Sequence, residues 1–232
     1  MKILALESSA VTASVAICED EKLIAQTFQN NGLTHSVTLL PMAEGLLSAC
    51  GMALGDVDVI AVAAGPGSFT GLRIGVAAAK GLAWAAQRPC AGVSTLEAMA
   101  WTLAHMGGNL CPVMDARRSQ VYNAPFLGQG GRPVRLTEDR AIGLNDLAEE
   151  LNAQKGTQIL VGDGAHLCYN DLKARGLDVE LAPEHLRYPC AWGVARGALE
   201  MARAGELTDA AALTPAYHRL SQAERERLAR QN

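Results

Sequence analysis

Three short polar stretches of this 232-residue chain follow apolar runs, and each has the composition of a turn that could hold an anion. They are Glu7-Ser8-Ser9, Gly65-Pro66-Gly67-Ser68 and Gly162-Asp163-Gly164-Ala165. Where a strand, a glycine turn and a helix follow one another, free N–H groups of the first helical turn can face a phosphate or carboxylate. A fourth stretch, Asp115-Ala116-Arg117-Arg118, offers two guanidinium groups for bidentate binding of such an anion. The candidate nucleotide- or anion-binding residues are therefore Glu7, Ser8, Ser9, Gly65, Gly67, Arg117, Gly162 and Asp163.

Each of these stretches is equally typical of a polar turn that binds nothing. No register around Gly65 supplies the lysine of Gly-x-x-x-x-Gly-Lys-Ser/Thr, and Thr70 occupies the last glycine position of Gly-x-Gly-x-x-Gly. Gly-x-Ser-x-Gly is missing, and the five histidines make no His-x-x-x-His pair. The motifs therefore indicate neither a serine hydrolase nor a metal site built on a single helix.

The composition suits a folded globular chain. Of its residues, 49% are hydrophobic and 19% are charged, and the formal net charge is −4. Neutralisation of phosphates by Lys and Arg supplies most nucleic-acid affinity, so tight autonomous binding to nucleic acid is not expected. Six cysteines are scattered without a Cys-x-x-Cys pair, which argues against a zinc cluster or disulfide scaffold. No apolar run approaches the roughly 20 residues of a membrane span, so we expect no membrane association and a cytoplasmic location.

Hydrophobic periodicity predicts an α/β chain whose first part, residues 1–107, is one lobe. Three strands joined by short turns form an antiparallel meander, and helices and strands then alternate. The predicted strands cover residues 2–6, 12–18, 23–28, 57–63 and 89–93, and the predicted helices cover 34–50, 71–87 and 94 to about 107. This order of elements is that of a ribonuclease-H-like fold.

The second part, residues 108–220, is predicted to form a smaller lobe, and its hydrophobic patterns are weaker than those of the first part. Its strands are expected at 110–114, 120–127, 134–136, 158–161 and 179–181, and its helices at 144–153, 165–175 and 190–204. Residues 221–232 form a charged tail with helical spacing, which is either solvated or bound to a partner.

The helix predicted from residue 71 to 87 has small residues along one face. Gly71, Gly75 and Ala79 are spaced four residues apart. A glycine inside a helix costs roughly 1 kcal/mol relative to alanine, so something is expected to approach closely. Two readings remain open at this point, namely close packing on the protein's own sheet and a helix–helix interface with another chain.

Several longer motifs occur in an order that resembles a known family. They are Leu4-Ala5-Leu6-Glu7-Ser8-Ser9, Gly65-Pro66-Gly67-Ser68-Phe69-Thr70-Gly71-Leu72-Arg73-Ile74-Gly75, Gly92-Val93-Ser94-Thr95-Leu96 and Pro215-Ala216-Tyr217-His218-Arg219. These motifs are distributed over essentially the whole chain, and through them the sequence resembles the bacterial TsaB family, also called YeaZ. The resemblance implies an ASKHA (actin/hexokinase/Hsp70-like) fold of two ribonuclease-H-like lobes, the second smaller and degenerate.

The resemblance also implies a function in tRNA modification. TsaB-like proteins are regarded as non-catalytic partners of TsaD in transferring the threonylcarbamoyl group to N6 of adenosine 37 in ANN-decoding tRNAs. The ATPase TsaE joins them, tRNA is met only through the complex, and the donor is made by a separate synthase. We therefore expect no required cofactor, with ATP or ADP only at a partner interface.

Comparison with the TsaD pattern gives a chemical reason for expecting no catalysis. TsaD-like proteins read Gly-Val-Asn-His-Met-Glu-Gly-His, and the two histidines bind metal. Here Thr95 and Met99 occupy the histidine positions, and neither is a credible ligand for zinc or a hard divalent cation. In the second lobe, Arg118-Ser119-Gln120 replaces the x-Gly-Glu of the family's Asp-Ala-Arg-x-Gly-Glu-x-Tyr, which weakens a ligand role for that turn.

If TsaD shares the fold, its helices equivalent to 34–50 and 71–87 could meet those of this chain. The same surface could form a two-fold homodimer when no partner is present. The predicted interface residues are His35, Leu39, Leu46, Gly71, Gly75, Ala78 and Leu82. A small actin-fold ATPase or kinase is the alternative function, since its phosphate-suited turns are present, and a metallopeptidase is less favoured because the metal ligands are missing.

Overall fold

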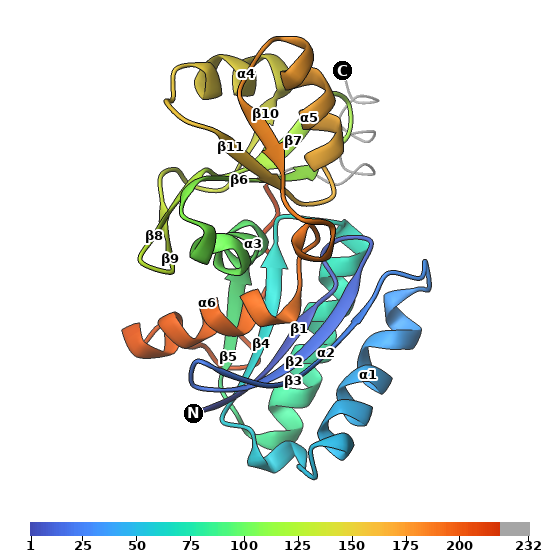
Figure 1. Cartoon of the computed structure of the whole chain (residues 1–232). Helices are drawn as coiled ribbons and strands as arrows, with labels where there is room; N and C mark the ends of the chain where they lie inside the picture. Colours follow the sequence, from blue (N-terminus) through green and yellow to red (C-terminus); the bar gives the residue numbers. More distant parts are fainter. Residues whose placement is uncertain (219–232) are drawn as a thin grey trace.

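Two sheets lie one above the other in the computed structural model, which describes residues 1–218, and helix α3 (Thr95–Leu103) lies between them (Figure 1). The first sheet has the strand order β3-β2-β1-β4-β5. Its strands are β1 (Lys2–Glu7), β2 (Ala13–Glu19), β3 (Lys22–Gln29), β4 (Val59–Gly65) and β5 (Cys90–Ser94). The meander β1–β2–β3 is antiparallel and β1–β4–β5 is parallel, which confirms the predicted order of this lobe.

Each face of the first sheet is covered by a pair of helices. Helices α1 (His35–Ala49) and α2 (Phe69–Ala86) pack on one face, where the alternating residues Leu4 and Leu6 of β1 point. Helix α3 and helix α6 (Ala191–Ala204) cover the opposite face, onto which Ile3 and Ala5 point. The sheet is therefore buried on both sides, as its parallel strands require.

The position of α6 differs from the predicted division of the chain. Residues 108–220 were expected to form the second lobe, but α6 returns to the first sheet, where Val194 and Ala198 pack with Ile3 and Ala5. The apolar stripe of a helix identifies a buried face without saying which sheet it meets. The first lobe therefore consists of residues 1–107 together with α6.

The second lobe is built on the strand order β10-β7-β6-β11-β12, with β8 paired to β6 and β9 paired to β8. Its strands are β6 (Gly108–Asp115), β7 (Gln120–Asn123), β8 (Phe126–Gln129), β9 (Arg132–Arg135), β10 (Arg140–Gly143), β11 (Gln158–Val161) and β12 (Val179–Leu181). Helices α4 (Leu144–Asn152) and α5 (Ala165–Ala174) accompany it. The strand predicted over 120–127 is divided at Ala124-Pro125, because proline cannot donate to a ladder, and β10 was not predicted.

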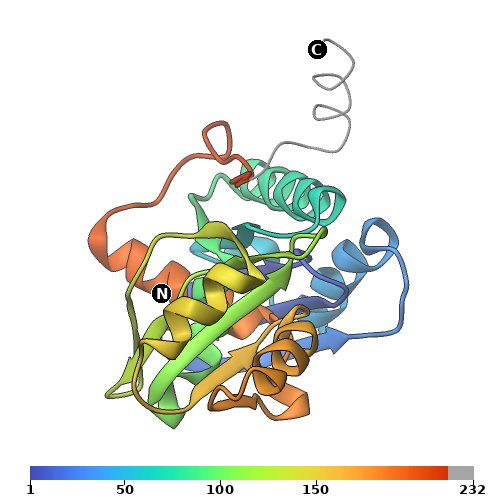
Figure 2. The same ribbon diagram turned by 90° about the horizontal axis from the view of Figure 1, so that it is seen from above.

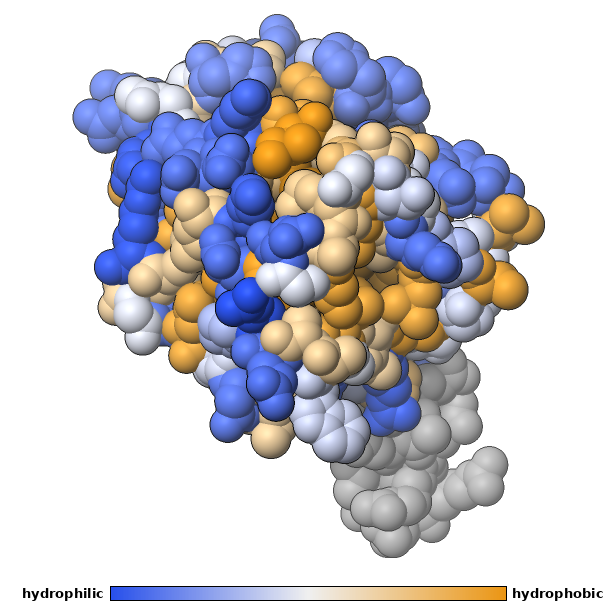
Figure 3. Space-filling view, turned by 90° about the horizontal axis from the view of Figure 1, so that it is seen from below, coloured by the Kyte–Doolittle hydropathy of each residue, from blue (hydrophilic) through white to orange (hydrophobic). Residues whose placement is uncertain are grey.

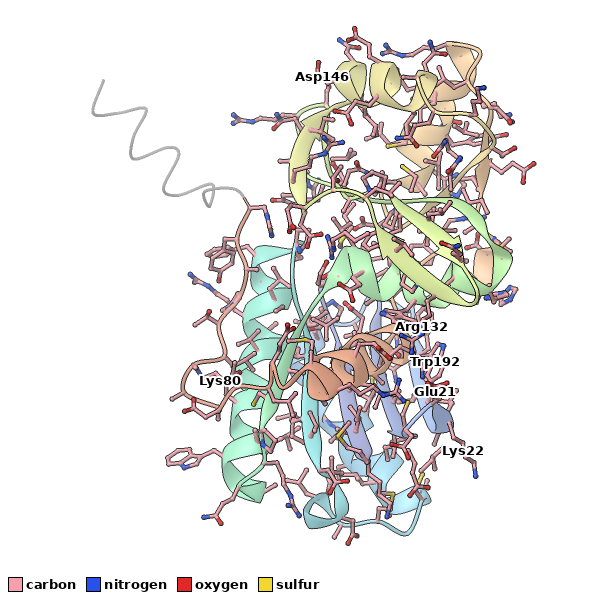
Figure 4. The ribbon with its side chains drawn as sticks, turned by 90° about the vertical axis from the view of Figure 1, so that its left-hand side faces the viewer. Glu21, Lys22, Lys80, Arg132, Asp146 and Trp192 are labelled. Carbon is pink, nitrogen blue, oxygen red and sulfur yellow. The ribbon has the colours of Figure 1, made fainter. Side chains whose placement is uncertain are left out.

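After α6 the chain crosses to α2 (Figure 2) and runs beside this helix toward the second lobe (Figure 4). Cys90 and Thr208 exchange two backbone hydrogen bonds of 2.7 and 2.9 Å. The ammonium of Lys80, on α2, donates to the carbonyls of Ala211 and Leu213 at 3.0 and 2.9 Å (Figure 4). This C-terminal segment, residues 205–218, therefore holds α2 against the sheet. The charged tail predicted from residue 221 lies outside the described residues.

Candidate functional site

The glycine turn between β4 and α2 lies directly against the first turn of the chain. A Cβ on Gly67 would lie 2.5 Å from the carbonyl oxygen of Ser9, and the N–H of Ser68 donates to that oxygen at 2.7 Å. Ser68 also caps α2, because its hydroxyl accepts the N–H of Gly71 at 3.3 Å. Gly65 has φ +135 and precedes a cis peptide bond to Pro66. Gly67 is thus required by the close approach of the two turns.

Glu7, Ser8 and Ser9 form a buried turn beneath α2. Oε1 of Glu7 accepts both the N–H and the hydroxyl of Ser9 at 2.6 Å. The hydroxyl of Ser8 donates to the carbonyl of Gly71 at 3.0 Å. All three residues are inaccessible to solvent, so the prediction that they contact a ligand is wrong for this structure. Their polar groups bond to one another and to α2 instead.

Glu7 is an unusual carboxyl group because it is completely buried. Burial raises its pKa from 4.5 to about 7, with a further small increase from the charge of Asp163, while the bonds from Ser9 oppose the shift. Its second oxygen, Oε2, has no hydrogen-bond partner among residues 1–218. At neutral pH this carboxyl group is therefore close to half protonated.

A cleft of about 640 Å³ separates the two lobes next to this turn. On one side it is lined by Gly67 and the first residues of α2, and on the other by Arg117 and Asp163. The structure thus places Gly67, Arg117 and Asp163, three of the residues predicted to bind an anion, on the walls of one cleft. The volume is that of a small-molecule site.

Gly65 and Gly162 are not part of this lining, although both were predicted to bind. A Cβ on Gly65 would collide with the carbonyl of Ala216, and one on Gly162 would collide with the carbonyl of Val113. Both residues are buried. Their glycine identity is explained by backbone packing, so the prediction of a ligand contact is wrong for these two positions.

The second-lobe wall of the cleft carries two carboxylates beside one guanidinium. Oδ1 of Asp163 accepts the N–H of Asp115 at 3.1 Å, and Oδ1 of Asp115 accepts the N–H of Arg117 at 2.7 Å. Burial, together with the charge of Asp115, raises the pKa of Asp163. This wall is not net positive, so it would hold a polyphosphate only together with a divalent cation such as Mg²⁺. Within residues 1–218, no three His, Cys, Asp or Glu side chains are grouped to hold a metal.

An aromatic pair forms the outer rim of the cleft. The rings of Phe69 and Tyr217 lie 4.9 Å apart, and the guanidinium of Arg73 lies 3.8 Å from the centre of the Phe69 ring. Nε of Arg73 donates to the hydroxyl of Tyr217 at 2.9 Å. Sequence reasoning missed this rim, because Tyr217 comes from the distant C-terminal segment and no local pattern connects it to α2.

The predicted interface residues separate into buried and accessible ones. Leu39, Gly71 and Gly75 lie inside the first lobe, so the prediction that they line an outer surface is wrong. A Cβ on Gly71 or Gly75 would collide with backbone or side-chain atoms of Ser8. The small residues of α2 therefore permit packing on the protein's own β1 turn.

The other predicted interface residues remain partly accessible on α1 and α2. Leu46, Ala78 and Leu82 are half-buried at the edge of the core. His35 is also half-buried, and its Nε2 lies 2.8 Å from the carbonyl oxygen of Ala10. An apolar groove of about 530 Å³ runs between the two helices and includes Leu82 in its lining.

Two exposed glycines, one on α1 and one on α2, have no explanation among residues 1–218. A Cβ on Gly45 of α1 or on Gly81 of α2 would meet nothing within 4 Å. Trp84, one turn from Gly81, is 81% exposed, and Val37, which lines a groove toward β3 together with Gly45, is 67% exposed. Figure 3 shows apolar side chains gathered in the middle and right of the view, where the lower ends of α1 and α2 lie. The feature of the sequence that could have indicated an exposed contact on α2 is Trp84, a single Trp in a helix of mostly small residues.

Thr95 and Met99, at the positions of the TsaD histidines, are enclosed by the protein. Thr95 is completely buried, and Met99 belongs to an apolar cluster with Met114 and Phe126. The hydroxyl of Thr95 has no hydrogen-bond partner among the described residues. These side chains serve as packing between the lobes.

Comparison with known proteins agrees with these features. The model of the TsaD family, described as tRNA N6-adenosine threonylcarbamoyltransferase, matches residues 26–161. The tRNA threonylcarbamoyladenosine biosynthesis protein TsaB of Bacillus subtilis is 34% identical over 230 residues, covering 97% of this chain and 96% of that protein. A crystal structure from Pseudomonas aeruginosa, of an uncharacterized protein with similarity to peptidase YeaZ, matches with a TM-score of 0.82 and 27% identity. That match covers 94% of this chain and 99% of the other.

The fold and these matches define a two-lobed α/β protein of the ASKHA class. Component A of (R)-2-hydroxyglutaryl-CoA dehydratase from Acidaminococcus fermentans matches with a TM-score of 0.50 at 11% identity, covering 88% of this chain and 99% of the other, which is a likeness of fold alone. The chain belongs to the TsaB (YeaZ) family of tRNA threonylcarbamoyladenosine biosynthesis proteins. Within residues 1–218, no helix combines the length and apolar character needed to cross a bilayer.

Proposed function

We propose that this chain is a non-catalytic subunit that holds a TsaD-like protein during threonylcarbamoyl transfer to N6 of adenosine 37 of tRNA. The outer face of α1 and α2 makes the contact. The observation that carries the proposal is the outward glycine Gly81, one helical turn from the exposed Trp84 on α2. A glycine within a helix costs about 1 kcal/mol, and Gly81 relieves no close contact with any of residues 1–218.

The spacing of residues on α2 supports a helix–helix contact. Arg73, Ala77, Gly81 and Trp84 follow one another at intervals of four, four and three residues, so they lie on one helical face. Small residues at 77 and 81 let a second helix approach, and Trp84 supplies the kind of large rigid side chain that dominates binding at interfaces. The groove beside Leu82 could accept a side chain of the partner.

The fold supports a partner of related structure. The TsaD family model matches residues 26–161, which include both α1 and α2. A TsaD-like protein would then present an equivalent helix pair, and two such pairs could pack around a pseudo-two-fold axis. Without that partner, two copies of this chain could use the same face as a homodimer.

The buried positions of Thr95 and Met99 support the non-catalytic part of the proposal. In this chain the residues that replace the metal-binding histidines fill space between the lobes. They offer no accessible ligand atoms, so the chemistry of transfer falls to the partner. TsaE and tRNA would join through the assembled complex.

Reconstitution with purified components tests the proposal. We expect this chain to bind a TsaD homologue in co-purification, to form no threonylcarbamoyladenosine alone, and to raise the rate of modification when both are present. Modification of tRNA by this chain alone, or an unchanged rate with a TsaD homologue that it does not bind, would contradict the proposal.

An ATPase or kinase is the second candidate, favoured only by the cleft beside the N-terminus of α2. The carboxylates of Asp115 and Asp163 on its wall would repel a free polyphosphate, so this candidate also needs a divalent cation. Turnover of ATP by the isolated chain above a buffer control would favour this candidate over the scaffold.

A further inference from the structure

Helix α3 is in contact with both lobes at once (Figure 1). It packs on α6 and β4 of the first lobe and on β6, β8 and β9 of the second. Leu96, Met99 and Leu103 are fully buried in a single apolar cluster with Leu110 and Phe126 of the second lobe. The two lobes therefore share a core, and no layer of solvent divides them along this helix.

Elements of both lobes approach α3 and its C-terminal end so closely that glycines are required at the points of contact. A Cβ on Gly193 of α6 would collide with the carbonyl of Ala98. A Cβ on Gly162 would lie 3.2 Å from the sulfur of Met99, and one on Gly128 of β8 would lie 3.1 Å from the carbonyl of Ala104. Glycines thus allow elements of both lobes to touch the helix directly.

A closed ring of polar bonds fixes the first turn of α3 to the second lobe. The hydroxyl of Ser94 accepts the N–H of Glu97 at 3.2 Å and donates to Asp139 at 2.6 Å. Arg135 of β9 donates to Asp139 at 2.5 Å and to Glu97 at 3.1 Å. The guanidinium also lies 4.7 Å from the centre of the Phe126 ring. Because Arg135 and Asp139 are largely buried, this ring is screened less than a surface ion pair.

A second link joins β9 to α6 at the edge of the molecule. Arg132 donates through two nitrogens to the two carboxylate oxygens of Glu200, at 3.1 and 3.3 Å. Glu200 also accepts from Arg203 at 2.8 Å. Figure 4 shows Arg132 close to Trp192 and Glu21 on this edge. Bidentate pairing fixes orientation as well as distance, so the β8–β9 hairpin is bound to the first lobe from two sides.

We infer that α3 holds the two lobes at one fixed angle, so that the cleft neither opens nor closes around a ligand. Hinge closure requires a few terminal or loop residues to absorb large φ/ψ changes while the lobes slide apart. Here such a movement would break the shared core, the ring around Ser94 and the Arg132–Glu200 pair together. The chain is therefore a rigid body that presents α1 and α2 in one geometry whatever occupies the cleft. This inference does not depend on the proposed partner.

Hydrogen exchange of the full chain, read by mass spectrometry, tests the inference. We expect amides of α3 to exchange as slowly as those of β4, within tenfold, because both open only in global unfolding. Millimolar Mg·ATP should change neither this pattern nor the radius of gyration in small-angle scattering. Exchange of α3 more than tenfold faster than that of β4, or a change of radius with Mg·ATP, would overturn the inference.

Substitution of the ring gives a second, independent test. In Arg135→Ala, and in the milder Ser94→Ala, amides of the first turn of α3 should exchange at least tenfold faster than in the wild type. Arg175→Ala is the matched control, because Arg175 pairs with Asp171 and Asn145 inside the second lobe. Exchange of α3 that is unchanged in both ring variants, or equally accelerated by the control, would overturn the role of the ring.

Discussion

Helix α2 carries glycine on two faces, and the surroundings of the two faces differ completely. On the inner face, a Cβ on Gly71 or Gly75 would collide with Ser8. On the outer face, a Cβ on Gly81 would meet nothing within 4 Å. The fold therefore explains the inner glycines, whereas nothing among residues 1–218 explains the outer one. A stripe of small residues indicates close approach, but only the space around each residue says what approaches.

The largest expected effect is on the inner face. Gly75→Leu places four carbon atoms against Ser8 and Val62, where even a Cβ has no room. We expect the free energy of unfolding to fall by about 3 kcal/mol, at the upper end of overpacking in cores. Urea denaturation measures this change.

Gly81→Leu is the control for Gly75→Leu on the same helix. Its free energy of unfolding should rise by up to about 1 kcal/mol, because leucine has the higher helix propensity and its Cβ meets no atom of residues 1–218 within 4 Å. If Gly75→Leu were as stable as the wild type and lost only partner binding, the assignment of the inner face would be wrong.

The second prediction concerns Glu7, in the turn beneath the inner face. Its pKa is raised from 4.5 to about 7 in the folded state, so the folded chain binds this proton more tightly than the unfolded chain. The stabilisation is complete below pH 4.5 and is lost as the pH rises through about 7. Glu7→Gln should remove this dependence, since an amide stays neutral and its oxygen can still accept from Ser9.

Urea midpoints at pH 5 and pH 8 measure the difference between Glu7→Gln and the wild type. At pH 8 the variant should be the more stable by about 2–3 kcal/mol, the free energy of a pKa shift of this size. Near pH 5 the two should differ much less. A difference that is the same at both pH values would show that Glu7 does not carry the raised pKa.

The third prediction tests whether the outer face of α1 and α2 binds the partner. Trp84→Ala should weaken binding of a TsaD homologue at least tenfold, and Leu40→Ala should weaken it by less, because large aromatic side chains dominate interface energies. Leu167→Ala on α5 is a matched control for Leu40→Ala, since the two leucines are 45% and 47% exposed, respectively, on helices of different lobes. Isothermal titration calorimetry gives the affinities. An equal loss in the two leucine variants would indicate a general effect of exposed apolar surface and would contradict the assignment of the face.

Local patterns predicted most of the secondary structure. Strands β11 and β12 begin and end at the predicted residues, and Ser68 and Ser94 cap α2 and α3 by their side chains. These features depend on neighbours within a few positions, which the sequence displays directly.

Features that depend on distant contacts could not be predicted in the same way. The return of α6 to the first sheet, the ring around Ser94 and the rim of Phe69 and Tyr217 all join residues that are far apart in the chain. For the candidate site, residue types at Glu7 and Gly162 were consistent with ligand binding, but burial gave them other partners. Only tertiary structure distinguishes a turn that faces solvent from one covered by a helix.

The smallest expected effect concerns Ser119, where the backbone conformation favours glycine but the residue is serine. Arg117, Arg118 and Ser119 have φ values of +66, +56 and +57, three consecutive non-glycine residues in the left-handed region. Each costs about 1–2 kcal/mol relative to the right-handed conformation. Ser119 stands where the TsaB-like pattern has glycine.

Ser119→Gly should therefore raise the free energy of unfolding by about 0.5–1 kcal/mol, after the greater entropy of glycine in the unfolded chain is subtracted. For a chain of this size that corresponds to a rise in Tm of roughly 1–4 °C, measurable by calorimetry. Ser48→Gly on α1 is the control, because the same substitution inside a helix should lower Tm. If both variants shifted Tm in the same direction, backbone strain would not be what distinguishes the two positions, and the turn would be held by side-chain contacts instead.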